Sequence, residues 1–225
     1  MMGIVVAVSG TSGAGKSTLM RHLAELQGGA ALMHFDDYIE LGTDAGDIRQ
    51  WVAAGAPADA IQTPRLADDL AALRSNRAVH PPGRSAPVAP AGLILLEEPF
   101  GRARSAIAPL IDLALHLELP PDIALARRSL RRARAYPGPD SPDPIAANWH
   151  AETLEDLVAQ FQAYLGPQRQ AYRLAEAQAK ALADVILDGL HPLPDLAAQA
   201  QRAIASLPDS RSQHVTKKPE NEEKP

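Results

Sequence analysis

The chain of 225 residues is long enough for one α/β domain, and 46% of its residues are hydrophobic, which suffices for a packed core. A formal net charge of −5 argues against a nucleic-acid-binding protein, and the lack of cysteine excludes disulfides, thiol catalysis and cysteine-based zinc sites. The first apolar run, Ile4–Val8, is too short to cross a membrane and follows no charged leader. We therefore expect a cytoplasmic protein without a membrane partner.

Apolar runs alternate with helical stretches along the chain. Short runs rich in branched aliphatic residues are typical of strands buried on both faces of a parallel sheet, and they lie at 4–8, 30–34, 93–96, 113–119 and 185–187. Helical spacing is found at 16–27, 47–54, 122–134, 149–181 and 196–207, with a break expected at Gly166-Pro167. This alternation predicts a three-layer α/β fold with a parallel sheet of five strands between helices.

Three segments depart from this simple alternation. Residues 40–90 are predicted to form a helical insert, in which Thr63-Pro64 has the residues of a helix start. Residues 127–146 join an arginine-rich helix to a proline-rich loop, a composition suited to a lid. The stretch 208–225 is polar and of mixed charge, so we expect a disordered tail after a single domain at 1–207.

The segment after the first strand fits the phosphate-binding pattern G-x-x-x-x-G-K-[ST]. Its glycines let backbone amides curl around a phosphate, and the helix that follows adds its positive N-terminal end. In this pattern Lys16 reaches the β- and γ-phosphates, and Ser17 offers its hydroxyl to Mg²⁺. We predict that ATP and Mg²⁺ are bound by Gly10, Thr11, Ser12, Gly13, Ala14, Gly15, Lys16, Ser17 and Thr18.

Acidic residues follow the second and third predicted strands. The carboxyl ends of parallel strands face the ligand crevice, so Asp36 and Asp37 are expected near the γ-phosphate. One of them could deprotonate an acceptor hydroxyl while the other contacts the Mg²⁺ water shell, although an Asp pair can also simply cap a loop. Glu97, directly after the third run, is the better metal candidate of Glu97-Glu98, the alternative being ordinary exposed charge.

Five arginines fall within residues 127–134. Arg127 with Arg131, and Arg128 with Arg132, are four residues apart and so share helix faces. Guanidinium groups match phosphate oxygens and can neutralise charge that develops during phosphoryl transfer. The alternative is a solvated basic face, but the proline-rich loop that follows favours a lid.

Two aromatic residues near these segments, Tyr38 and Trp51, could stack on an acceptor or simply pack within the insert. The seven histidines have no metal-ligand spacing. Since His116 falls inside a predicted strand, we expect it in the core rather than in catalysis.

Taken together, these motifs resemble the uridine kinase-like family of P-loop kinases, which includes nicotinamide riboside kinase, phosphoribulokinase and pantothenate kinase. The resemblance extends over about residues 3–190 and rests on 10–18, 36–38, Glu97, 126–132 and 183–187. It implies a P-loop NTPase fold and transfer of the γ-phosphoryl group of ATP to an alcohol group of a small molecule. The roles it implies are a catalytic base for Asp36, phosphate and Mg²⁺ contacts for Lys16 and Ser17, a metal-shell carboxylate for Glu97, and lid residues for Arg128 and Arg131.

Two departures from that family concern the acceptor rather than the phosphoryl-transfer residues. His80–Arg84 stands where uridine kinases carry Pro-x-Tyr-Asp followed by His and Arg, and Glu98 stands where glycine is usual. Another class is a regulatory GTPase or ATPase, but the sequence lacks Asn-Lys-x-Asp, a switch Asp-x-x-Gly and Leu-Ser-Gly-Gly-Gln. A third is a nucleotide-binding protein that has lost catalysis and acts through partners.

Overall fold

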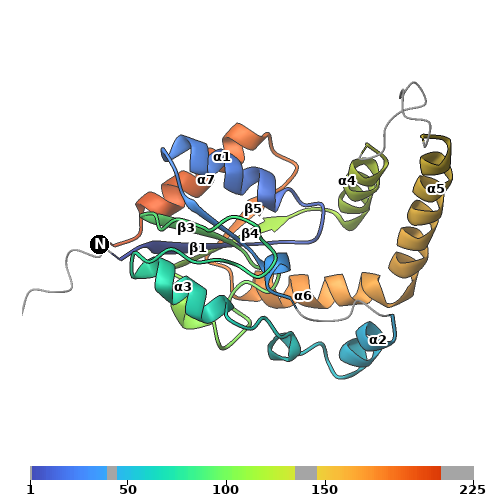
Figure 1. Ribbon diagram of the computed structural model, residues 1–225, viewed down its shortest axis with the longest axis horizontal. Coiled ribbons are helices and arrows are strands. Elements are labelled where there is room, and N and C mark those ends of the chain that lie inside the picture. The colour runs from blue at the N-terminus through green and yellow to red at the C-terminus, as the bar shows by residue number, and fades with distance from the viewer. Residues whose placement is uncertain (1, 40–44, 135–145, 209–225) are drawn as a thin grey trace, which may run out of the picture.

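The computed structural model describes residues 2–39, 45–134 and 146–208, without the side chains of residues 45–46 and 146–153. Its centre is a sheet of five parallel strands in the order β2-β3-β1-β4-β5 (Figure 1). The strands are β1 (Ile4–Ser9), β2 (Ala31–His34), β3 (Leu93–Glu97), β4 (Leu113–Glu118) and β5 (Val185–Asp188). Each strand matches one of the apolar runs, so the predicted parallel sheet is confirmed.

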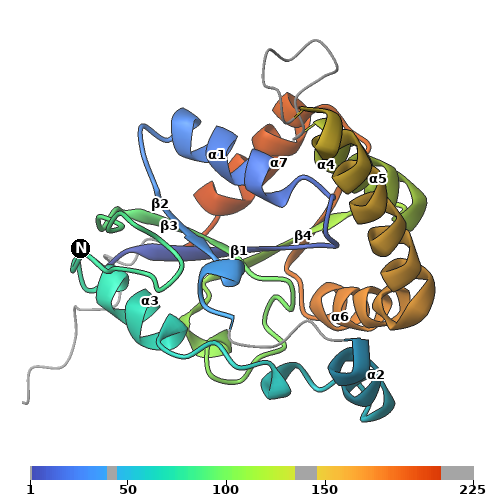
Figure 2. The same cartoon turned by 45° about the vertical axis from the view of Figure 1, so that its right-hand side comes forward.

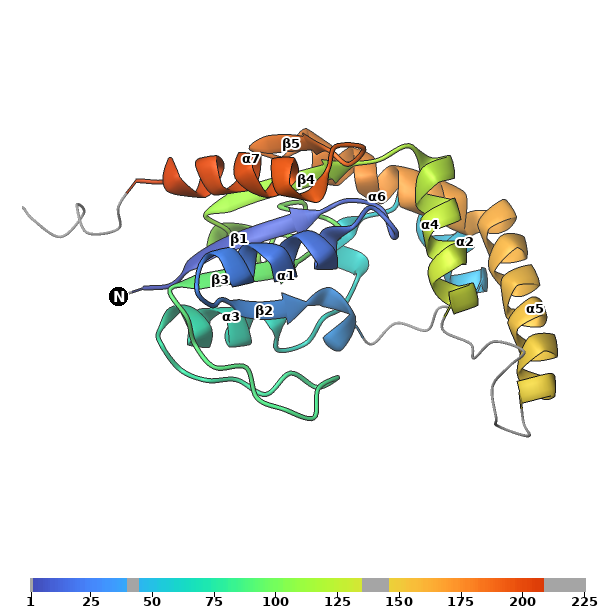
Figure 3. The same ribbon diagram turned by 90° about the horizontal axis from the view of Figure 1, so that it is seen from above.

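Both faces of the sheet are buried, because successive side chains of a strand point to opposite sides. Val6 and Leu95 belong to the apolar cluster on one face, and Val5 and Ile94 belong to the cluster on the other. The helices α1 (Lys16–Leu26) and α7 (Leu193–Ala205) cover the first face, and α3 (Leu66–Arg74) covers the second (Figures 1 and 3). With a glycine-rich loop after the central strand β1, this is the predicted three-layer P-loop NTPase fold.

The predicted insert at 40–90 contains two helices with different surroundings. The helix α2 (Ala45–Ala53) lies away from the sheet, whereas Leu66 and Leu70 of α3 are fully buried against it. The expected helix start at Thr63-Pro64 is wrong. Arg65 has a left-handed backbone with φ of 70°, which a helix interior does not allow, so α3 begins at Leu66.

Three helices connect β4 to β5 beyond the carboxyl ends of the strands. They are α4 (Pro121–Arg134), α5 (Ala146–Ala163) and α6 (Arg169–Ala181), and a π-helical segment (Tyr164–Gln168) joins the last two. The predicted break at Gly166-Pro167 is confirmed, since Gly166 has non-helical angles of −82° and −136°. Figures 1 and 2 show α4 and α5 projecting from the sheet while α6 returns on the side of α3.

Two sequence predictions fall partly outside the described residues. Of the predicted lid at 127–146, the structure describes the part that belongs to α4, up to Arg134. The proline-rich loop of this lid, within 135–145, lies outside the described residues. Of the predicted tail at 208–225, only Pro208 is described. Among the described helices, none combines the length and apolarity needed to cross a membrane.

Candidate active site

The predicted site residues gather where the strands end. In the sheet, Glu97 at the end of β3 is in register with both Val8 of β1 and His34 of β2. The glycine-rich loop follows β1 and the aspartates follow β2, so all three groups reach the same edge. They line a cavity of about 650 Å³ together with two arginines of α4, and its main members are the loop residues 12–18, Asp36, Asp37, Glu97, Arg127 and Arg131.

The loop itself depends on glycine at two positions. A Cβ atom on Gly10 would lie 2.5 Å from the carbonyl oxygen of Leu117, and one on Gly13 would lie 2.4 Å from that of Ala124. Both glycines also have positive φ angles, 138° and 94°, which favour a residue without a side chain. The loop therefore packs against β4 and α4 with its backbone alone, which leaves its other side free for a phosphate chain.

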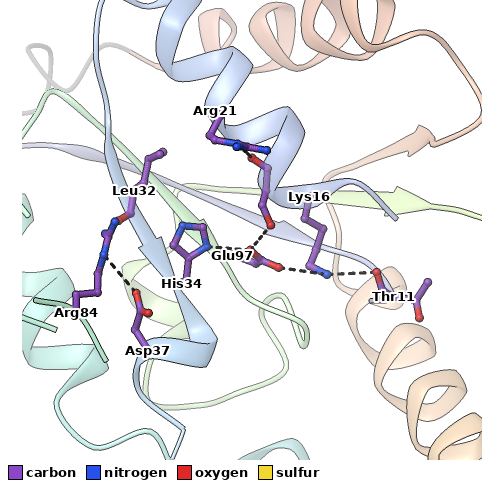
Figure 4. Close-up of polar contacts among 9 residues, drawn as sticks. Thr11, Lys16, Arg21, Leu32, His34, Asp37, Arg84 and Glu97 are labelled. Atoms are coloured by element: carbon purple, nitrogen blue, oxygen red, sulfur yellow. Dashed lines mark hydrogen bonds and ion pairs between the residues drawn. The ribbon is translucent and has the colours of Figure 1, made fainter. Parts of the chain in front are cut away.

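Glu97 is the centre of a polar network at this edge (Figure 4). One of its oxygens, Oε2, accepts hydrogen bonds from Ser17 Oγ and from His34 Nδ1, each at 2.9 Å. The other, Oε1, lies 3.4 Å from Lys16 Nζ, which also donates to the carbonyl oxygen of Thr11 at 3.2 Å. Ser17 and Glu97 thus present a hydroxyl and a carboxylate side by side, the oxygen ligands that Mg²⁺ prefers.

The surroundings of this network shift the pKa values of Glu97 and Lys16. Burial by itself raises the pKa of Glu97, but the hydrogen bond from His34, the charge of Lys16 and the hydrogen bond from Ser17 outweigh it, and the pKa falls to about 2. Burial lowers the pKa of Lys16, whereas Glu97 and Asp36 counteract that shift. The described residues contain no group of three or more acidic or histidine side chains able to hold a metal ion by themselves. A Mg²⁺ ion here would complete its shell with water and phosphate oxygens.

The two neighbouring aspartates have different surroundings. The side chain of Asp36 is exposed, lines the cavity and makes no hydrogen bond with any described residue. Asp37 is tied down, because its Oδ2 lies 3.8 Å from Arg84 Nε and its carbonyl oxygen accepts from Gly83 N at 2.9 Å. Arg84 also donates to the carbonyl oxygen of Leu32, so the 80–84 segment is held against β2 and restricts the position of Asp37 (Figure 4).

The arginines of α4 divide between two environments. Arg127 and Arg131, on one helix face, line the first cavity, and Arg127 donates to the carbonyl oxygen of Ala14 at 3.4 Å. Arg128, for which the resemblance also implies a lid position, does not line this cavity. Its guanidinium lies over the rings of Tyr164 and Tyr172, with distances of 5.4 and 5.1 Å to the ring centres. Because α4 turns Arg128 toward these rings, Arg127 takes the expected place beside Arg131.

A second, smaller cavity of about 380 Å³ adjoins the first and has mostly apolar walls. Its aromatic wall is built by edge-to-face contacts, with the Phe100 ring 6.0 Å from that of Phe35 and 6.1 Å from that of Trp51. The helix α6 adds Tyr172 and Glu176. The two cavities have a common boundary, formed by Ser12, Lys16, Asp36 and Glu97.

Glu98 supports the aromatic wall from behind. For Glu97-Glu98 the sequence left ordinary exposed charge as the alternative to a metal site, but the Glu98 side chain is fully buried and pairs with Arg104 at 2.6 Å. Arg104 also donates to Thr63 Oγ1 at 2.6 Å and lies over the Phe35 ring, 5.2 Å from its centre. The buried pair therefore fixes Phe35, and sequence reasoning missed it because Thr63, Glu98 and Arg104 meet only in the folded chain.

The two aromatic residues considered for acceptor binding, Trp51 and Tyr38, lie in different surroundings. Trp51 lines the second cavity. Tyr38 does not, because it is 2% exposed and donates its hydroxyl hydrogen bond to Asp69 at 2.7 Å, so it belongs to the core. Burial and the contact with Asp69 raise the pKa of Tyr38. His116 is fully buried, as expected of a core residue, with Nδ1 3.0 Å from Ser9 Oγ.

No protein-family model matches the chain, and no curated protein has a matching sequence. Solved structures similar to it carry the names of kinases. A provisionally assigned fructose transport system kinase from Silicibacter sp. TM1040 is 18% identical over 83% of this chain and 90% of its own, with a TM-score of 0.49. Shikimate kinase from Acinetobacter baumannii is 17% identical over 91% and 94%, with a TM-score of 0.45. A provisionally assigned uridine kinase from Bacillus stearothermophilus is 15% identical over 84% and 90%, with a TM-score of 0.45.

Proposed function

We propose that this chain is a kinase that transfers the γ-phosphoryl group of ATP to a hydroxyl group of a small molecule. One observation carries the proposal: a polar cavity beside the glycine-rich loop and a mostly apolar cavity share a boundary made of Ser12, Lys16, Asp36 and Glu97. A donor in the first cavity and an acceptor in the second would meet at these four residues. A phosphoryl transferase needs such a meeting point, because the reacting atoms must be held in line.

The first cavity suits a triphosphate. Lys16, Arg127 and Arg131 supply positive charge around the glycine-rich loop, and α1 directs its positive end toward it. Ser17 and Glu97 would hold Mg²⁺, which when bound neutralises charge on the β- and γ-phosphate oxygens. Lys16 would then exchange its contact with Glu97 for the phosphates, and its lowered pKa reflects how little water it has around it.

Asp36 is the proposed catalytic base. The hydroxyl oxygen of the acceptor attacks the γ-phosphorus and forms the new oxygen–phosphorus bond, while the bond to the β,γ-bridging oxygen breaks and ADP leaves with that electron pair. The hydroxyl proton goes to the carboxylate of Asp36, which accepts no hydrogen bond from any described residue. Lys16 and Arg131 neutralise the charge on the transferred group. We further propose that α4, which carries Arg131, belongs to a lid at about 127–146 on a single domain at 1–207.

A regulatory nucleotide-binding protein is the rival class. It would require the first cavity but not the second, since no acceptor has to reach the γ-phosphate. The aromatic cavity next to Asp36 favours the kinase, because its volume of about 380 Å³ lies in the range of small-molecule sites.

The test follows the phosphoryl group itself. ATP labelled with ¹⁸O in the γ-position is incubated with the protein, Mg²⁺ and a mixture of neutral, cationic and anionic hydroxyl compounds, and the products are analysed by mass spectrometry. We expect a labelled phosphate ester, strongly reduced by Asp36→Asn and less reduced by the matched variant Asp37→Asn. Label found only in inorganic phosphate, at equal rates in both variants, would contradict the proposed function.

A further inference from the structure

The second cavity has a chemical character that limits what can bind there. Aromatic rings of Phe35, Trp51 and Phe100 line it from the first half of the chain, and α6 contributes the ring of Tyr172. Flat apolar groups bind well to such walls, because ring contacts add specific geometry to the burial of apolar surface. The cavity therefore fits a ligand with a planar apolar ring of modest size.

The charges around this cavity are almost all negative. Asp36, Glu97 and Glu176 line it, and among the described lining residues the only cation is Lys16. That lysine lies 3.4 Å from Glu97 and belongs to the phosphate boundary rather than to the aromatic wall. An anionic acceptor would lose its hydration here and face carboxylates without a basic partner, which is unfavourable.

Glu176 is the carboxylate whose role the phosphoryl transfer does not explain. It comes from α6, next to Tyr172 by one helical turn, and its side chain is 19% exposed. The nearest basic group among the described residues is His116, whose Nε2 lies 3.9 Å from Oε1 of Glu176, too far for a hydrogen bond. The buried Nε2 atom of His116 has no hydrogen-bond partner either. No described residue thus donates a hydrogen bond to Glu176, and its carboxylate remains available to a ligand in the cavity.

The charged groups around Glu176 leave its carboxylate without a cationic partner among the described residues. Burial and the charge of Glu118 raise the pKa of Glu176, whereas Lys180 lowers it. Lys180 itself pairs with Glu118 rather than with Glu176. Arg128, Arg169 and Arg173 line a small neighbouring space with Glu176, but within the described part of the chain none of them forms an ion pair with it. The guanidinium of Arg128 lies instead on the rings of Tyr164 and Tyr172.

We propose that the acceptor combines a planar apolar ring and a hydroxyl group with a cationic nitrogen, and that Glu176 is the specificity residue that binds this nitrogen. The inference rests on the proposed function, since it assigns the acceptor class of the same site. In this arrangement the ring lies against the aromatic wall, the hydroxyl lies near Asp36 and the nitrogen lies near Glu176.

Three probes of one shape test this assignment. They are 2-amino-1-phenylethanol, 1-phenylethane-1,2-diol and mandelate, which share a phenyl ring and a hydroxyl but carry an ammonium, a neutral hydroxymethyl and a carboxylate group. Affinities are measured by calorimetry at saturating Mg-ADP. A hydrogen bond to a charged group is stronger than one between neutral groups, so we expect the amine to bind at least about tenfold more tightly than the diol. Mandelate should bind most weakly.

The variants make the test specific. Glu176→Gln should weaken binding of the amine about tenfold and leave that of the diol within about twofold. Glu25→Gln is the control, because Glu25 is an exposed carboxylate of α1 that lines neither cavity, and it should preserve the order of the probes. Mandelate binding as tightly as the amine, an amine preference that survives Glu176→Gln, or failure of all three probes to bind would each overturn the assignment. Failure of the proposed function would show separately, as an absence of Mg-ADP binding or of phosphoryl transfer.

Discussion

The two adjoining cavities of this protein are built in different ways. The first cavity, proposed to hold the phosphates, has one continuous segment, residues 12–18, in its lining, and Lys16, Arg127 and Arg131 bring positive charge to it. The second cavity, proposed for the acceptor, is formed by several separate segments and is aromatic and acidic. A triphosphate offers only charge and repeated oxygen atoms, and a glycine-rich loop is sufficient to bind it. A specific acceptor needs shape, which only packed side chains supply.

The difference also appears in how each cavity is supported. Lys16, Ser17 and His34 converge directly on Glu97 at the phosphate cavity, so its polar groups hold one another. The aromatic wall instead depends on a buried ion pair behind it, Glu98 with Arg104. Changes at the first cavity should therefore affect phosphate chemistry, whereas changes behind the second should affect folding and acceptor binding together.

The largest effect is expected at the boundary between the cavities. Asp36→Asn keeps the shape of the side chain but cannot accept the hydroxyl proton, so kcat should fall about 10²–10⁴-fold. The affinity for Mg-ATP should change little, because Asp36 makes no hydrogen bond with any described residue and acts on Lys16 only through its charge. Steady-state kinetics with the acceptor identified by labelled ATP measures kcat, and calorimetry measures the affinity for Mg-ATP. If Asp37→Asn is the more damaging change, the base is assigned to the wrong carboxylate.

A change behind the aromatic wall should act on stability. Arg104→Ala leaves the fully buried Glu98 without its partner, and the free energy of unfolding should drop by about 3–5 kcal/mol. The matched control is Arg132→Ala, because the Arg132–Asp156 pair is exposed and its loss should cost less than about 1 kcal/mol. Urea unfolding of the three proteins gives both values. Equal small losses in the two variants would show that the buried pair does not support the wall.

Acid should weaken the phosphate cavity through Glu97. Its folded pKa of about 2 lies below its usual value of 4.5, so its contribution to stability is present above pH 4.5 and is lost as the pH falls toward 2. The contribution amounts to about 3 kcal/mol at most. Unfolding free energies measured between pH 5 and 2.5 should fall more steeply in the wild type than in Glu97→Gln. Parallel curves for the two proteins would contradict the network around Glu97.

A smaller effect is expected for nucleotide affinity. Lys16→Ala removes one charge-assisted contact of about 1.5–3 kcal/mol, so the Kd for Mg-ATP should rise about 10- to 100-fold. The control Lys180→Ala removes an exposed lysine that pairs with Glu118, and it should leave the Kd unchanged. Circular dichroism verifies that both variants are folded. Unchanged Mg-ATP binding by a folded Lys16→Ala protein would contradict the phosphate cavity.

The sequence was sufficient to predict whatever depends on neighbouring residues. Strands, most helices and the glycine-rich loop follow from local apolar patterns and from the spacing within 10–18, and the break at Gly166-Pro167 follows from the chemistry of those two residues. Glu97 and Asp36 were placed at one edge because parallel strands all end there.

Long-range contacts could not be obtained in this way. The hydrogen bond between His34 and Glu97 joins residues 63 positions apart and requires the strand register. The four-residue spacing of the arginines allowed either Arg127 or Arg128 to face the phosphates, and only the rotation of α4 decides between them. Tyr38 follows the aspartates directly, yet its hydroxyl finds Asp69 of α3 in the core.

If the two neighbouring cavities hold the two substrates, changes in each cavity should affect the Michaelis constant of one substrate only. Arg131 lines only the phosphate cavity of the pair and Trp51 only the acceptor cavity. With the acceptor identified by labelled ATP, Arg131→Ala should raise KM for ATP about tenfold and leave KM for the acceptor within about twofold. Trp51→Ala should do the reverse. If Trp51→Ala instead raises KM for ATP as much as KM for the acceptor, the second cavity is not a separate acceptor site and the account is wrong.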